Sequence, residues 1–226
     1  MSVDGRVHYE VIRGFVADGY PPDLDALARK TGIPHDEVVA SLRRLHEQHG
    51  LVLHPDSTAI WVAPPFSSSP TGAWVASGAR GWWAPCAWCA MGIVVLAAPE
   101  ATIHVRIGGE SKPAEIVVRG GEIASEDLFV HFSIPARDAW NNVVHYCATV
   151  LPFERVEDVA QWCTRHALPQ GDVVPLTRVL VLAREWYRRH LDIDWRKWTL
   201  AEAQAIFDKV GLRGDTWRLP GGQGIF

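Results

Sequence analysis

The spacing of apolar residues changes twice along this chain, and this limits the folds it can adopt. Up to about residue 50 they recur at helical spacing, as in "VHYEVIRGFV". Short β-rich runs then follow, such as "ATIHVRIGG" and "AEIVVRGGEI", separated by Gly, Pro and Glu. From about residue 155 the chain is helical again. The pattern predicts an α+β fold, with a mixed β-sheet domain flanked by late helices.

The first 65 residues are expected to form a unit of their own. Three helical stretches end in "HDEVVASLRRLHEQHG", and "LVLHPDSTAIWVAP" then alternates like two short strands around a turn. Three helices and a two-stranded ribbon predict a winged-helix-like domain over residues 1–65. The prolines, serines and glycine of "APPFSSSPTGAW" predict a linker over residues 66–80, which leaves residues 81–226 as the main domain.

Charge and hydropathy argue against several partners. The net charge is −4, so we expect no broad basic field to hold nucleic acid or an anionic membrane. The third predicted helix would enter a DNA groove, but it offers both acids and bases there: His35, Asp36, Glu37, Arg43 and Arg44. No apolar run approaches the roughly 18 residues of a membrane span, and the first residues lack a secretory signal. We therefore expect a cytoplasmic protein, while the oligomeric state stays open.

Four cysteines carry the main chemical signal. In a reducing compartment they are expected to be free thiols, metal ligands or catalytic groups. Cys86 and Cys89 form a Cys-x-x-Cys pair within "GWWAPCAWCAMGI", which fits a redox pair, half a zinc site or coincidence. The sequence has no second such pair for zinc, and the redox interpretation lacks a βαβ setting and a helix start. Cys163 lies at a core-facing position of a predicted helix, where a buried hydrophobe is expected.

The stretches "AWCAMG" and "HYCATVLPF" resemble the organomercurial (alkylmercury) lyase family. In that family a cysteine in Trp-Cys-Ala-x-Asp and a second in Cys-x-x-Val-x-Phe-Phe form the site together with the aspartate. Cys89 matches the first and Cys147 the second, with Pro152 in place of one phenylalanine. The N-terminal helices and "EDVAQWCTRH" also resemble the family, so the likeness spans most of the chain. Gly92 stands where the family has its aspartate.

The resemblance implies that Cys89 and Cys147 are catalytic nucleophiles and metal ligands. Mercury is a soft metal that thiolates hold well, and the carbon bonded to it can leave only if it receives a proton. Without an aspartate at Gly92, that proton would come from the Cys86 thiol, from His145 or from water. No cofactor is required, although Hg or Cu could bind at the thiols.

Four residues are expected to contact the substrate: Cys86, Trp88, Gly92 and His145. Cys86 is either a third sulfur ligand for the metal or a structural thiol beside a proline. His145 precedes Cys147 by two positions, so on a strand both side chains would share a face. It could then acidify a thiol or bind metal, or be a hydrogen-bonded core residue. Three tryptophans are candidate walls of an apolar pocket: Trp82, Trp83 and Trp88.

These observations predict an alkylmercury-lyase-like enzyme that uses paired thiols on an organometallic or other small thiophilic substrate. The reaction would be carbon–mercury protonolysis or a diverged lyase reaction. The alternatives are a non-catalytic soft-metal (Hg/Cu) binding protein and a metal-sensing winged-helix regulator. We expect Cys89 and Cys147 to converge in space, and we expect Gly92→Asp to raise carbon–mercury cleavage by supplying a proton carrier.

Overall fold

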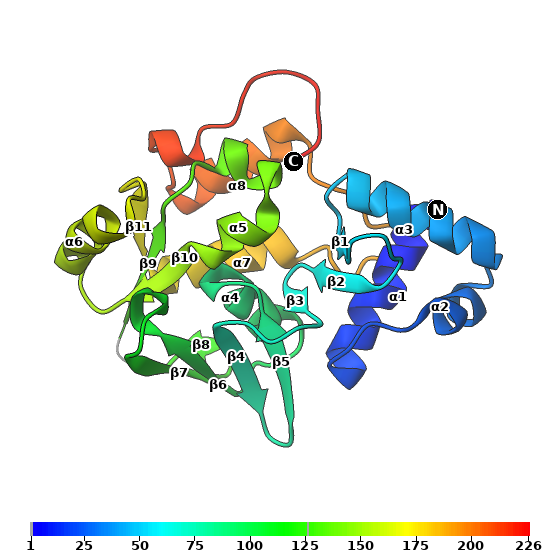
Figure 1. The fold of residues 1–226 in the computed structure, drawn as a ribbon, viewed down its shortest axis with the longest axis horizontal. Coiled ribbons are helices and arrows are strands. Elements are labelled where there is room, and N and C mark those ends of the chain that lie inside the picture. The colour runs from blue at the N-terminus through cyan, green and yellow to red at the C-terminus, as the bar shows by residue number, and fades with distance from the viewer. Residues whose placement is uncertain (1, 126) are drawn as a thin grey trace.

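The computed structural model describes residues 2–125 and 127–226 and has the predicted α+β architecture (Figure 1). It begins with three helices and two short strands: α1 (Val3–Asp18), α2 (Leu24–Thr31), α3 (His35–Glu47), β1 (Val52–Leu53) and β2 (Ile60–Ala63). Side chains cap the first two helices, since Ser2 accepts from the Gly5 N–H and Asp23 from the Ala26 N–H. Both helices end at glycines in the left-handed conformation, Gly19 and Gly32.

The larger sheet has eight strands in the order β1-β2-β3-β5-β4-β6-β7-β8, and every pairing in it is antiparallel, where we expected a mixed sheet. Its further strands are β3 (Phe66–Ser67), β4 (Ala73–Ser77), β5 (Arg80–Ala84), β6 (Ala101–Arg106), β7 (Pro113–Arg119) and β8 (Glu122–Ile123). The linker predicted over residues 66–80 is therefore wrong. Ser68, Ser69 and Pro70 lie between β3 and β4, and β3 joins the N-terminal ribbon to the main sheet.

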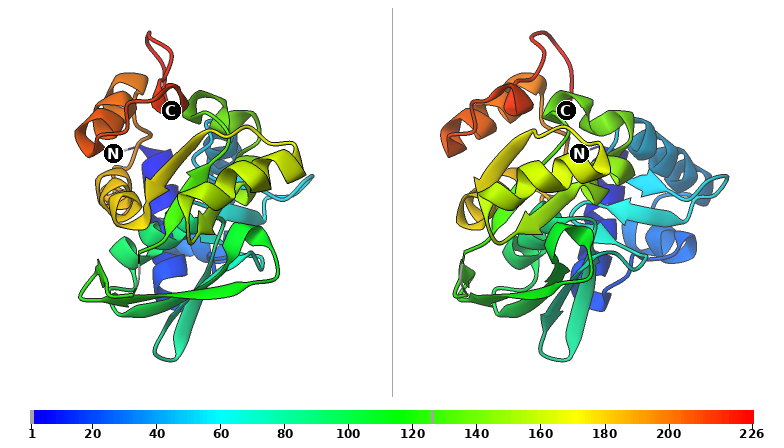
Figure 2. Two further views of the ribbon diagram at one scale, coloured as in Figure 1. Left: turned by 90° about the vertical axis from the view of Figure 1, so that its left-hand side faces the viewer. Right: turned by 60° about the vertical axis from the view of Figure 1, so that its left-hand side comes forward.

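A second, three-stranded antiparallel sheet has the order β10-β9-β11 (Figure 2). It contains β9 (Phe129–Phe132), β10 (Val150–Phe153) and β11 (Asp172–Pro175). The helices around it are α5 (Val143–Ala148), α6 (Val156–His166), α7 (Leu176–Tyr187) and α8 (Leu200–Val210). Short 3-10 turns complete the fold: η1 (Ile107–Gly109), η2 (Ala136–Asn141) and η3 (Asp215–Trp217). The late helices lie where the sequence predicts them.

Helix α4 (Ala87–Leu96) lies in the middle of the molecule and positions the site. It packs against α7 on one side and against β4 and β5 on another. All eight residues from 87 to 94 are buried, so the helix is apolar on every face, as expected of a core helix. Its place in the core fixes the side chains at its N-terminus.

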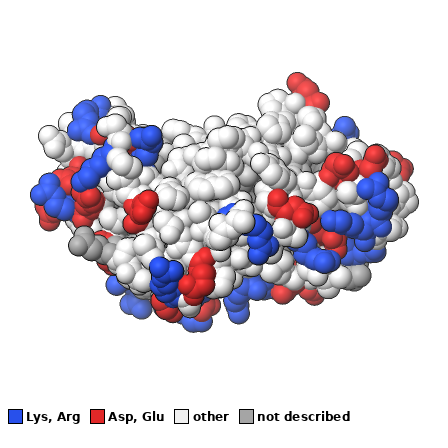
Figure 3. Space-filling view, turned by 90° about the horizontal axis from the view of Figure 1, so that it is seen from below, with Lys and Arg blue, Asp and Glu red and all other residues white. Residues whose placement is uncertain are grey.

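The N-terminal helices pack on the rest of the protein through one continuous core. The Trp82 indole N–H donates to the Phe15 carbonyl at 2.6 Å, and the Phe15 ring stacks on Phe66. On the face shown in Figure 3, positive and negative side chains are interspersed around an uncharged area. Among the described residues, no helix has the length and apolar character to cross a membrane.

Candidate active site

Three thiols converge at the N-terminus of α4. The sulfurs of Cys86, Cys89 and Cys147 all lie within 4.8 Å of one another, and all three residues are buried. The predicted convergence of Cys89 and Cys147 is confirmed, although they are 58 positions apart in the sequence. No other set of three His, Cys, Asp or Glu side chains in the described chain lies close enough to share a metal ion.

The local fold explains how Cys86 and Cys89 meet. Strand β5 delivers the chain in extended form to Cys86, which is the N-cap of α4, and its sulfur accepts a hydrogen bond from the Cys89 N–H at 3.3 Å. Residues three positions apart lie on one side of a helix, so Cys89 stands beside Cys86. The sequence did not indicate a helix start at this pair. The structure corrects that, because α4 begins there.

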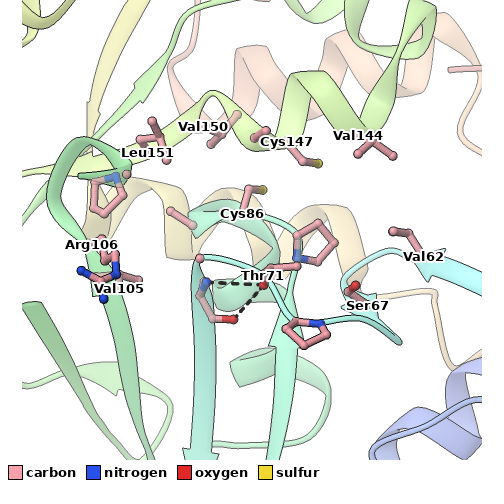
Figure 4. A pocket seen from close by; sticks show the side chains of 18 of the residues that line it. Val62, Ser67, Thr71, Cys86, Val105, Arg106, Val144, Cys147, Val150 and Leu151 are labelled. Carbon is pink, nitrogen blue, oxygen red and sulfur yellow. Dashed lines mark hydrogen bonds between the residues drawn. The ribbon is translucent and has the colours of Figure 1, made fainter. Parts of the chain in front are cut away.

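Cys147 reaches the pair from α5, across the cavity shown in Figure 4. The Asn142 side chain caps this short helix by accepting from the His145 N–H at 3.0 Å. In Figure 4 the sulfurs of Cys86 and Cys147 face each other from opposite sides of the cavity. A residue from a separate element therefore completes the sulfur cluster.

The cavity beside Cys86 and Cys147 has a volume of about 370 Å³. Its lining is mostly apolar and includes Val62, Val105, Val144, Val150 and Leu151. Its polar groups are few, among them Ser67, Thr71 and Arg106. The Thr71 hydroxyl donates to the Ala84 carbonyl at 2.6 Å. A ligand in this cavity would meet sulfur and hydrocarbon.

A second, smaller cavity of about 40 Å³ lies against Cys89 and Cys147. Its walls are largely aromatic: Trp88, Trp140, Tyr146, Trp186, Tyr187 and Phe226. The Tyr187 hydroxyl lies 3.6 Å from the Cys89 sulfur, close enough to hydrogen-bond with it. Among the described residues that line the two cavities there is no Asp, Glu or His.

The three thiols differ in acidity because their surroundings differ. Burial disfavours the Cys86 thiolate, but hydrogen bonds from the Cys147 and Cys89 thiols and from backbone N–H groups outweigh it, so the pKa of Cys86 lies well below its usual value. The Cys86 and Cys89 sulfurs, with burial, raise the pKa of Cys147. At Cys89 a hydrogen bond from Cys147 favours the thiolate, but Cys86 and burial oppose it, and the net pKa is raised. Of the three thiols, Cys86 is therefore the one whose deprotonation these surroundings favour.

Of the residues predicted to contact the substrate, Cys86 belongs to the cluster, Trp88 and Gly92 lie beside it, and His145 does not. Trp88 is a wall of the smaller cavity. Gly92 lies on α4 one turn beyond Cys89, where a Cβ atom would come within 2.5 Å of the Tyr187 ring and 2.7 Å of Pro65. His145 is exposed and lines neither cavity, because residues 143–148 form a helix where we expected a strand. On a helix, residues two positions apart point in different directions.

The structure contradicts the prediction that Trp82 and Trp83 line the pocket, and it confirms that Cys163 is buried. Neither Trp82 nor Trp83 lines either cavity. Trp82 points toward α1, and Trp83 contacts Trp74 on β4. Cys163 is buried on α6, as predicted, away from the other thiols, and its sulfur lies 3.6 Å from His131. Successive side chains of a strand point to opposite faces, so Trp82 and Trp83 on β5 point in opposite directions, and neither reaches a cavity.

The sequence does not indicate the two tyrosines of the smaller cavity. Tyr187 ends α7, and its helical spacing with Leu180 and Ala183 indicates only a buried residue. No local pattern shows that it meets a thiol 98 positions earlier. Burial raises the pKa of both Tyr146 and Tyr187 well above the usual value, so both phenols keep their protons at neutral pH.

Comparisons with known proteins agree with this geometry. The sequence model of the family described as MerB: Alkylmercury lyase matches residues 66–188, which is more than half of the 226-residue chain and includes all three clustered cysteines. The chain belongs to the alkylmercury lyase family. That membership fits a lyase-like protein with a buried cysteine cluster and no cofactor requirement.

Solved structures show the same fold. Ten chains match, and one of them is described as the crystal structure of the mercury-bound form of MerB2. It is 22% identical in sequence, with a TM-score of 0.66, and the match covers 81% of this chain and 91% of that one. No curated protein matches the chain.

Proposed function

We propose that this protein cleaves the carbon–mercury bond of small organomercury compounds, with Cys86, Cys89 and Cys147 as the groups that take the metal. The observation that carries the proposal is the cluster of three buried sulfurs, within 4.8 Å of one another, at the wall of an apolar cavity. Sulfur is the ligand that soft metals prefer, and the family is one of organomercurial lyases.

The chemistry balances with one thiolate and one thiol. The Cys86 thiolate displaces the ligand of an organomercury cation and forms a sulfur–mercury bond. The carbon–mercury bond then breaks, and its electron pair takes a proton that a second cysteine has given up. The products are a hydrocarbon and a mercury ion held by two sulfurs, to which the third can add. Cys89 and Cys147 are the two candidates for the second sulfur, since both lie next to Cys86.

The larger cavity supports a substrate with an apolar organic group. Its volume of about 370 Å³ is in the range of small-molecule sites, and its walls are mostly apolar, with five valines and a leucine among them. Alkyl- and arylmercury compounds carry such groups. All four cysteines are free, which supports action in a reducing compartment such as the cytoplasm.

The decisive experiment is a single turnover with purified, reduced protein. Phenylmercury and methylmercury are added with an external thiol, and benzene and methane are measured. We expect stoichiometric mercury retention with release of hydrocarbon, and loss of both in Cys147→Ser. Cys163→Ser is the matched control, because Cys163 is buried outside the cluster, and it should behave like wild type.

The same experiment separates the proposal from a soft-metal binding function. Mercury retention without any hydrocarbon would favour a non-catalytic Hg or Cu binding protein. The regulator hypothesis has less support, because the exposed start of α3 carries Asp36 and Glu37, and Arg44 is paired with Asp4 at 2.7 Å. We propose that nucleic acid is not a partner, and salt-dependent binding of a DNA duplex would contradict this.

A further inference from the structure

Cleavage of a carbon–mercury bond needs a proton donor beside the thiols, and the described walls of both cavities contain no Asp, Glu or His. The hydroxyls of Ser67 and Thr71 in the larger cavity donate to backbone carbonyls, those of Ser69 and Ala84. Two phenols remain, Tyr146 and Tyr187, both in the smaller cavity. The donor must therefore be sought among the phenols and the thiols themselves.

Tyr187 is the phenol whose oxygen contacts a sulfur of the cluster. Its hydroxyl lies 3.6 Å from the Cys89 sulfur, and either atom can donate in this contact. The side chain is only 2% exposed, and its ring packs near Trp88 and His190. This packing fixes the hydroxyl next to the thiol.

The ring of Tyr187 also occupies the space in front of Gly92. A Cβ atom at position 92 would approach two Tyr187 ring carbons to 2.5 and 2.6 Å, far inside van der Waals contact. Any side chain at position 92 would therefore compete with Tyr187 for this place next to Cys89. The absence of a side chain at Gly92 makes room for the phenol.

We propose that Tyr187 is a catalytic residue that relays the Cys89 thiol proton to the departing carbon, an inference that rests on the proposed function. As the carbon–mercury bond breaks, the Tyr187 O–H bond breaks and its proton forms the new C–H bond. The phenol oxygen takes the Cys89 proton in the same step, and the Cys89 sulfur bonds to mercury. Tyr187 ends as it began, so no phenolate is left among thiolates.

Tyr187→Phe tests the relay, because it keeps the ring and removes one oxygen. Wild type and variant are loaded with one equivalent of phenylmercury, the mercury–thiolate adduct is quantified by its ultraviolet absorption, and benzene release is followed in a single turnover. We expect equal adduct formation and a release rate at least about tenfold lower, since a positioned general acid contributes roughly 10²–10⁴-fold. Tyr146→Phe, from the same cavity, is the comparison and should lose less of the release rate than Tyr187→Phe, because Tyr187 is the phenol whose oxygen lies against a cluster sulfur.

The outcomes separate the relay from the proposed function. Release by Tyr187→Phe at the wild-type rate, or an equal loss in Tyr146→Phe, would overturn the relay alone. Absence of benzene from wild type would overturn the proposed function and the relay with it. A second measurement does not depend on how the variant folds: release by wild type should be slower in D₂O than in H₂O, and equal rates would overturn the relay.

Discussion

At the scale of single residues, the cysteines, Trp88 and Gly92 were predictable, whereas His145 and Tyr187 were not. The motifs around Cys89 and Cys147 identify a thiol pair, and the structure places Cys86, which the sequence left as either a third ligand or a structural thiol, in the same cluster. His145 was misplaced, because a two-residue spacing gives a shared face only on a strand, and this segment is a helix. The contact of Tyr187 with Cys89 joins residues 98 positions apart, which short-range patterns do not encode.

The close packing around Gly92 also involves residues distant in sequence, and it leads to a prediction about stability. We expect Gly92→Ala to destabilise the protein by up to about 2 kcal/mol. Overlap of its Cβ with the Tyr187 ring and Pro65 in a close-packed region costs about 1–3 kcal/mol, and alanine recovers roughly 1 kcal/mol over glycine within a helix. Urea unfolding of both proteins measures the difference.

The control for this substitution is Gly214→Ala, where an added Cβ has no atom within 4 Å. It should change the free energy of unfolding by no more than about 0.5 kcal/mol. Equal stability of Gly92→Ala and wild type would show that Tyr187 moves aside easily. The same overlap opposes our expectation from the sequence that Gly92→Asp would raise cleavage, since an aspartate begins with the same Cβ atom.

At the scale of elements, one helix terminus combines a structural and a chemical role. Cys86 caps α4 through its contact with the Cys89 N–H, and it also lines the larger cavity. Helix N-termini favour negative charge, which suits a thiolate. The sequence indicates an apolar element near this point, but the flanking proline and tryptophans obscure where the helix begins.

Two substitutions at Cys86 separate these roles. We expect Cys86→Ser to keep the cap, since serine is a good N-cap residue, and Cys86→Ala to cost about 0.5–2 kcal/mol in the free energy of unfolding. Both should retain Hg²⁺ less well than wild type in competition with dithiothreitol, because each removes a sulfur. Mercury retention by Cys86→Ser equal to that of wild type would assign the metal to Cys89 and Cys147 alone.

At the scale of the whole molecule, the α+β class, the N-terminal helices and the late helices α6, α7 and α8 followed from the sequence. The sequence did not predict that the N-terminal strands and the strands of the main domain form one continuous eight-stranded sheet. Residues 66–80 contain the serines, proline and glycines typical of a linker, yet β3 and β4 belong to one sheet. Strand pairing depends on partners distant in sequence, and local composition shows only where turns occur. For the same reason, the sequence does not show which residues meet at the junction between the N-terminal helices and the main domain.

That junction contains buried histidines. His8 on α1 is fully buried, its two ring nitrogens have no hydrogen-bond partner among the described residues, and its ring stacks on Trp195 at 3.6 Å. The His190 ring lies 5.5 Å from it. Burial, followed by the neighbouring His190 and Lys197, lowers the pKa of His8 well below 6.5, and burial, followed by Lys197, lowers the pKa of His190 to about 3. Both histidines are therefore neutral in the folded protein at neutral pH.

These buried histidines predict a loss of stability in acid. Below pH 6.5 the unfolded chain binds protons at His8 and His190 that the folded chain excludes, down to about pH 3 for His190, so their contribution is complete above pH 6.5 and falls with decreasing pH. The loss approaches about 1.4 kcal/mol per pH unit for each group. We expect His8→Phe to reduce the dependence of the free energy of unfolding on pH by about the amount that corresponds to one proton. Phenylalanine keeps the stacked ring and loses no hydrogen bond made in the described structure. Urea unfolding from pH 4 to 7.5 measures the slope, with the exposed His145→Gln as control, and equal slopes for His8→Phe and wild type would place the acid sensitivity elsewhere.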